Sequence, residues 1–131
     1  MKNIYGMSCM TAAEGKILRE NEKCLTADVC PQNPSGEFMM AAIFLNPRAI
    51  EFFAKRTSMM CLIAAKLDCT TGNFIHKKTK KIRTALNKNN TRGVMYANLS
   101  HAEIELYGHL MNVMKFGPRA GHLYKINGQS K

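Results

Sequence analysis

The segment from Ser100 to Pro118 carries clear start and stop signals for a helix. Ser100 and Glu103 have the spacing of a capping box, in which each side chain bonds the backbone amide of the other residue. Apolar side chains then recur on one face, at Ile104, Tyr107, Met111 and Met114. Gly117 suits the left-handed helix stop, and Pro118 prevents the helix from continuing. The sequence therefore predicts a helix over residues 101–116.

Other start signals predict further helices. Thr11 and Glu14 form a second capping box, which predicts a short helix over residues 11–22. Asn46 followed by Pro47 is typical of a helix start. The apolar period after it predicts helices over residues 47–55 and 58–67, with a break at Thr57. Thr79 can cap a helix that runs to about residue 87, with its lysines on one side and an apolar stripe on the other.

Short apolar runs between turns predict strands. The run at residues 37–45 contains aromatic and β-branched members, and its length favours a strand over a helix. Residues 73–76, 94–97 and 122–126 are further strand candidates. The predicted fold class is mainly α with a small β-sheet. We expect residues 1–36 to form an N-terminal extension with a short helix and a Pro/Gly linker, and residues 37–131 to form the main domain.

The positive charge lies almost entirely in the second half of the chain. Residues 1–68 have a net charge of +1, whereas residues 69–131 have a net charge of +9. The stretch from His76 to Arg92 contains no acidic residue. Such a concentration of charge destabilises a protein by self-repulsion, so a polyanionic partner is expected.

The order of the predicted elements is that of a winged helix-turn-helix, in which one helix enters the DNA major groove and a hairpin lies along the backbone. The residues expected to bind nucleic acid are Lys77, Lys78, Lys80, Lys81, Arg83, Lys88, Arg92, His101, His109, Asn112, Lys115, Arg119 and Lys125. Two placements fit this architecture. Either the helix over residues 101–116 reads the groove, or the basic helix over residues 79–88 does so with residues 92–97 as the wing.

Several segments resemble the small plasmid replication initiators of the RepL type. They are the apolar helix that ends in residues 64–68, the Thr-Gly-Asn turn after it, the basic helix around residues 81–86, and the wing-like residues 121–127. The resemblance covers residues 44–131. It implies a winged-helix protein that binds double-stranded DNA at a replication origin. Transcriptional repressors share the same element order, so a regulatory role is also compatible.

The sequence favours a binding protein over an enzyme. His101 and Glu103 have the H-x-E spacing of zinc deaminases, but the P-C-x-x-C partner motif is missing. The five cysteines lack the spacing of a zinc site or a closed disulfide framework. We therefore expect no catalytic residue, no metal and no cofactor. RNA, or an acidic protein partner of a mobile element, is the alternative to DNA.

Assembly and location follow from more general arguments. A single small module makes few DNA contacts, so we expect a homodimer that works with replication or transcription machinery. The sequence contains neither a long apolar span nor a secretory signal. We therefore expect a cytoplasmic protein without a membrane partner.

Overall fold

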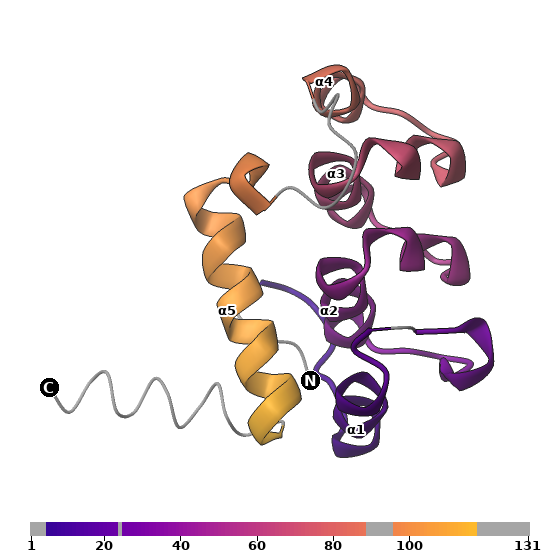
Figure 1. Cartoon of the computed structure of the whole chain (residues 1–131), viewed down its shortest axis with the longest axis vertical. Helices are drawn as coiled ribbons and strands as arrows, with labels where there is room; N and C mark the ends of the chain where they lie inside the picture. Colours follow the sequence, from indigo (N-terminus) through magenta and orange to yellow (C-terminus); the bar gives the residue numbers. More distant parts are fainter. Residues whose placement is uncertain (1–4, 24, 89–95, 118–131) are drawn as a thin grey trace, which may run out of the picture.

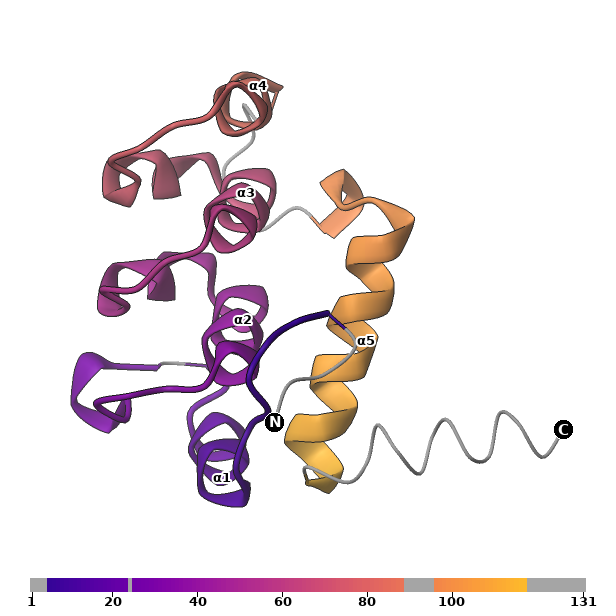
Figure 2. The same cartoon turned by 180° about the vertical axis from the view of Figure 1, so that it is seen from behind.

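The protein is a stack of helix-and-turn units with one helix laid across it. The computed structural model describes residues 5–23, 25–88 and 96–117. Helices α1 to α4 lie one above another in Figure 1, each seen nearly end-on, with α5 running along one side of the column. In the reverse view of Figure 2, the short turns between the stacked helices again lie on the side opposite α5.

The stacked helices share one N-terminal design. Their bounds are α1 (Ala12–Glu20), α2 (Gly36–Leu45), α3 (Ser58–Leu67) and α4 (Lys80–Lys88). A hydroxyl before each helix accepts a hydrogen bond from the amide three residues further on, at 3.1 to 3.2 Å. These caps are Thr11, Ser35, Thr57 and Thr79. The last three caps follow one another at intervals of 22 residues, so the chain is a short array of structural repeats.

A 3₁₀ turn follows each of the first three helices and leads to the start of the next one. These turns are η1 (Ala27–Val29), η2 (Pro47–Phe52) and η3 (Cys69–Phe74). Just before η2, the Asn46 side chain accepts a hydrogen bond from the amide of Arg48 in that turn. Just before η3, the Asp68 side chain accepts one from the amide of Thr70 in the same way. Asn and Asp favour such turns because their side chains supply a local acceptor. Asn46 and Asp68 are also 22 residues apart.

Equivalent positions in successive repeats build the hydrophobic core. The third residue is Phe38 in α2, Met60 in α3 and Ile82 in α4, and each of these side chains is at most 2% exposed. The sixth residue is Ala41, Ile63 or Ala85, and these are buried as well. Full burial of a side chain as large as Phe38 contributes about 2 kcal/mol to folding. The period of the core thus matches the period of the caps.

Helix α5 (His101–Phe116) covers the side of the stack opposite the turns. It packs against α1 and α2, and the short η4 (Tyr96–Asn98) before it packs against α3. The Arg19 guanidinium of α1 donates to the Met114 carbonyl of α5 at 2.5 Å, and the Tyr96 hydroxyl donates to the Phe44 carbonyl of α2 at 2.5 Å. Figure 1 shows α4 beyond the N-terminal end of α5. Among the residues that the structure describes, none of α5 covers α4, so one face of α4 is exposed.

The predicted winged helix-turn-helix with a small β-sheet is wrong. The secondary structure of residues 5–23, 25–88 and 96–117 is helical, and no β-strand occurs there. Helices α4 and α5 do not form a helix-turn-helix pair, because α5 crosses the stack and packs on α1 and α2. The predicted wing at residues 121–127 lies outside the described residues.

The strand predicted at residues 37–45 is helix α2. This helix packs against α1 and α3 in the stack, against η2 and against α5, so nearly all of its residues are buried. A helix that is apolar all round has no amphipathic period. Its sequence therefore looks like a buried strand, and length is a weak criterion at ten residues.

Among the remaining predicted elements, most of the helices are confirmed and the strands are not. The structure confirms the helices predicted over residues 11–22, 58–67, 79–87 and 101–116, including both predicted capping boxes. The helix predicted over residues 47–55 is only the 3₁₀ turn η2. The strand predicted at residues 73–76 is also wrong, because Asn73 and Phe74 belong to η3. Residue 96, from the strand predicted at 94–97, begins η4, and residues 94 and 95 lie outside the described part.

Candidate nucleic-acid interface

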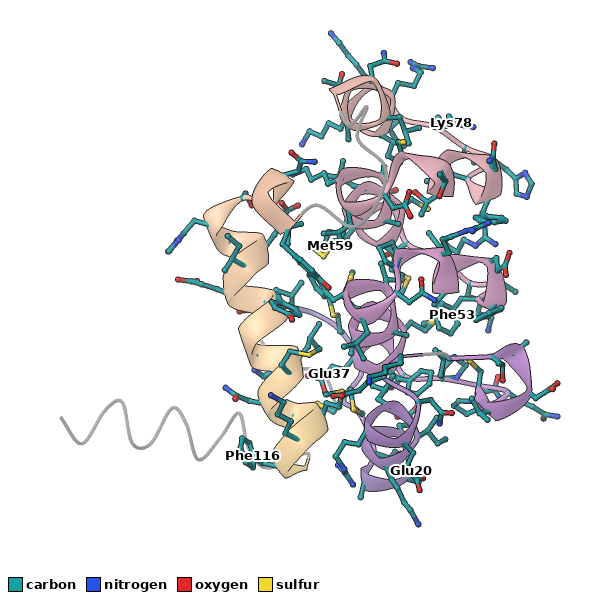
Figure 3. All side chains as sticks on the ribbon, viewed as in Figure 1. Glu20, Glu37, Phe53, Met59, Lys78 and Phe116 are labelled. Atoms are coloured by element: carbon teal, nitrogen blue, oxygen red, sulfur yellow. The ribbon has the colours of Figure 1, made fainter. Side chains whose placement is uncertain are left out.

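Basic side chains gather at the uncovered α4 end of the stack. Lys77 and Lys78 lie in the turn before α4, and Lys80, Lys81 and Arg83 lie on α4 itself; all five are exposed. Figure 3 shows Lys78 beside α4, at the end of the column farthest from α1. We call these five residues the basic end. The N-terminus of α4 adds a partial positive charge to it.

The outward face of α4 is polar along its length. Lys80, Arg83, Thr84 and Asn87 are exposed, whereas Ile82 and Ala85 are buried against the stack. This three- and four-residue spacing places the polar residues on one side of the helix. A polar outer face is also what a terminal repeat needs in order to stay soluble. Solubility alone, however, does not require that the charges all have one sign.

The same basic pair precedes two successive helices. Lys55 and Arg56 stand before α3 where Lys77 and Lys78 stand before α4. The Arg56 Nε donates to the Phe53 carbonyl, and the Lys78 ammonium donates to the Ile75 carbonyl, each at 2.8 Å. A second guanidinium nitrogen of Arg56 donates to the Phe74 carbonyl.

The second cation of each pair therefore also has a structural role, since it holds the end of the 3₁₀ turn. Lys78 keeps further N–H donors for a ligand, because an ammonium has three. Lys55 and Lys77 are exposed at equivalent places on neighbouring repeats. These two lysines form a short basic row along the edge where the helices begin.

No carboxylate pairs with the basic end in the described part of the chain. The ion pairs found there join Lys66 to Glu103, His101 to Glu105 and His109 to Glu37. None of them includes a residue of the basic end. The charge is therefore balanced only by solvent and mobile ions, which a polyanion can displace.

The predicted site residues on α5 lie away from the basic end. His109 faces the interior, where its Nε2 is 3.0 Å from the Glu37 Oε2. Asn112 is half-buried, and Lys115 is exposed in the last turn of α5, next to α1. His101 is exposed at the N-terminus of α5 and lies 3.1 Å from Glu105. The structure thus does not bring the α5 residues together with α4.

Some predicted residues cannot be located. Arg92, Arg119 and Lys125 lie outside the described residues, and so does the side chain of Lys88. Lys55 and Arg56, in contrast, were not among the predicted site residues. The 22-residue spacing of Thr57 and Thr79 is the signal that could have identified them, because it aligns the residues before the two caps.

Glu37 is a buried acidic residue that forms polar contacts with two other segments. Its Oε1 accepts a hydrogen bond from the Met10 amide at 2.7 Å, while its Oε2 contacts His109. The labelled Glu37 in Figure 3 lies between α2 and α5. Burial, with a smaller effect of the Glu37 charge, raises the pKa of the nearby Cys9 thiol. A raised pKa disfavours a thiolate nucleophile at Cys9.

The contacts of Glu37 therefore favour a structural role, in which it joins α2, α5 and the segment before α1. Within the described ranges, no three His, Cys, Asp or Glu side chains are placed to share a metal ion. No helix there is both long and apolar enough to cross a membrane.

No protein-family model, curated protein or solved structure matches the chain. The functional conclusion therefore rests on the residues and their geometry.

Proposed function

We propose that the protein binds double-stranded DNA through its basic end and acts without catalysis. The observation that supports this proposal is the gathering of five exposed cations at the α4 end of the stack, where none of them pairs with a carboxylate of the described residues. Neutralising DNA phosphates releases condensed counterions, which supplies the binding free energy. A role in plasmid replication or transcription, and a homodimer, remain predictions.

Helix α4, one of the two helices predicted to read the groove, makes the groove contacts in this proposal, which uses no wing. It is exposed on one side, and that side presents Lys80, Arg83 and Asn87. An α-helix fits the major groove, and Arg and Asn side chains can bond base edges there. Lys77 and Lys78, just before the helix, are suited to phosphates on the flanking backbone.

A duplex is favoured over a single strand because residues 77–88 contain no Phe, Tyr or Trp side chain on which bases could stack. The nearest aromatic residue in the chain is Phe74, which is half-buried and lies 5.7 Å from the Arg48 guanidinium. Charge alone does not distinguish DNA from RNA. The test therefore compares DNA duplex, RNA duplex and single strand.

Fluorescence anisotropy with a labelled duplex of about 24 base pairs, measured across a salt series, tests the proposal. Five phosphate contacts predict a log–log salt slope of about −4.5. Lys77→Ala with Arg83→Ala should make the slope less steep by about 1.8. The matched control is Lys16→Ala with Lys23→Ala, which removes the same charge from exposed positions on and just after α1, and should leave the slope unchanged.

Three outcomes would contradict the proposal. Absence of duplex binding at low salt would remove it altogether. An equal loss of affinity in the two double variants would show that net charge, rather than the basic end, drives binding. Tighter binding to RNA duplex than to DNA duplex would favour the alternative partner.

A further inference from the structure

A pocket opens between α3, α4 and η4, near the residue at which α5 begins. Its volume is about 440 Å³, within the range of small-molecule sites. The described residues that line it are Leu62, Lys66, Lys80, Lys81, Thr84, Ala85 and Asn98. Helix α5 covers the same side of α2.

The charge of the pocket matches one phosphate group. The Lys66 ammonium lies 2.8 and 3.0 Å from the two carboxylate oxygens of Glu103, so its charge is already compensated. Lys80 and Lys81 belong to no ion pair in the described part of the chain. A phosphate monoester carries about −1.5 to −2 charges at pH 7, which two ammonium groups would balance.

The rest of the pocket requires more than a phosphate. Leu62 and Ala85 supply apolar surface from two neighbouring helices. The Thr84 hydroxyl donates to the Lys80 carbonyl at 2.9 Å, and the Asn98 amide donates to the Lys66 carbonyl at 2.9 Å. Both side chains then present oxygen acceptors. A fitting ligand therefore combines a phosphate, a flat or apolar body and an N–H donor.

We propose that this pocket binds a nucleoside monophosphate whose base carries an exocyclic amine. The phosphate pairs with Lys80 and Lys81, the base lies between Leu62 and Ala85, and its amine donates to Asn98 or Thr84. The same chemical group could come from a free nucleotide or from an unpaired nucleotide at a strand end. This inference goes beyond duplex binding and does not depend on it, although both use Lys80 and Lys81.

Isothermal titration calorimetry of the full chain with the four ribonucleoside 5′-monophosphates tests the proposal. The nucleotides with an amine should bind with a dissociation constant below about 1 mM. Uridine monophosphate, which lacks the amine, should bind more weakly. Inorganic phosphate and adenosine, the two halves of one ligand, should each bind at least about tenfold more weakly than adenosine monophosphate.

Variants separate the pocket from the basic end. Leu62→Trp fills the pocket from α3 without changing charge, and should weaken nucleotide binding about tenfold or more while duplex binding is unchanged. Arg83→Ala changes a residue that does not line the pocket, and should leave nucleotide binding unchanged. If Leu62→Trp fails to fold by circular dichroism, Asn98→Ala serves instead, with an expected loss of the preference for amine-bearing bases.

Three results would overturn the inference. One is absence of nucleotide binding, and another is nucleotide binding that Leu62→Trp and Asn98→Ala leave unchanged. The third is inorganic phosphate that binds as tightly as the nucleotides.

Comparison of a blunt duplex with one that carries a 5′-phosphorylated one-nucleotide overhang distinguishes the two sources. Tighter binding of the overhang that Leu62→Trp abolishes assigns the ligand to a strand end. Equal binding of the two duplexes, together with mononucleotide binding, assigns it to a free nucleotide. The Leu62→Trp and Arg83→Ala variants also separate failure of this inference from failure of duplex binding.

Discussion

The contact between Glu37 and His109 gives a sharp test of how α5 is held on the stack. The Glu37 side chain is 3% exposed, and its two oxygens accept from the Met10 amide and contact His109 of α5. Glu37→Gln keeps the shape and one carbonyl acceptor but removes the charge. His109→Phe keeps a ring next to Tyr5, whose ring centroid is 5.7 Å from that of His109, but removes the bond to Glu37.

The expected magnitudes follow from these two bonds. A hydrogen bond to a charged group contributes about 2 kcal/mol, and a neutral one contributes about 1 kcal/mol. Glu37→Gln weakens both bonds, so it should lower the free energy of unfolding by about 2 kcal/mol. Only one of the two bonds involves His109. The coupling energy between Glu37→Gln and His109→Phe should therefore be about 1 kcal/mol.

Urea unfolding of the wild type, the two single variants and the double variant at pH 7, followed by circular dichroism, measures this coupling. The control cycle uses His101→Phe and Glu105→Gln on the same helix. Those side chains are 89% and 63% exposed, so solvent screening should reduce their coupling to about 0.5 kcal/mol or less. Coupling at Glu37 and His109 no larger than in the control cycle would refute the packing of α5 through this contact.

Two smaller predictions concern a helix cap and an acidic side chain. The Thr79 hydroxyl accepts a hydrogen bond from the Ile82 amide, so Thr79→Ala should lower the free energy of unfolding by about 1 kcal/mol and the melting temperature by about 4 °C. The control is Thr84→Ala on the same helix, which should leave both nearly unchanged. Burial alone would raise the pKa of Glu103, but hydrogen bonds from Lys66 and Ser100 hold it below the ordinary value of 4.5. Glu103 therefore stabilises the folded chain above that pH, and the contribution is lost on acidification through the folded pKa. Glu103→Gln should reduce the fall in melting temperature below about pH 4.5, and parallel melting curves for the variant and the wild type would contradict this assignment.

Local signals in the sequence were sufficient to place most of the helices. The boxes at Thr11 and Ser100 and the cap at Thr79 work over three residues, so a single sequence displays them. The helix does end at Gly117 with a positive φ of 96°, but its ψ of 174° lies outside the left-handed helical region that the sequence predicted. These signals fix where a helix begins or ends. They do not fix what it packs against.

The errors in the predicted fold come from contacts between distant parts of the chain. Helix α2 lacks an amphipathic period only because α5, more than fifty residues later, covers the side that a surface helix would expose. Glu37 gives no sign in the sequence that it accepts the Met10 amide and contacts His109. The repeat itself was visible in the spacing of Ser35, Thr57 and Thr79. A search for internal periods before the assignment of strands would have indicated a helical stack.

The position of the charge is best understood from the order of the repeats. Helix α5 packs on α1 and α2, and η4 packs on α3, so within the described residues α4 is the stacked helix that lies beyond this cover. Helix α4 is the one of the four stacked helices in which lysines are concentrated, and it contains no acidic residue. A terminal repeat needs polarity to stay soluble, but that need is met by charges of either sign. The single sign of the charge at α4 is therefore the part of the sequence that packing does not explain, and a polyanionic ligand does explain it.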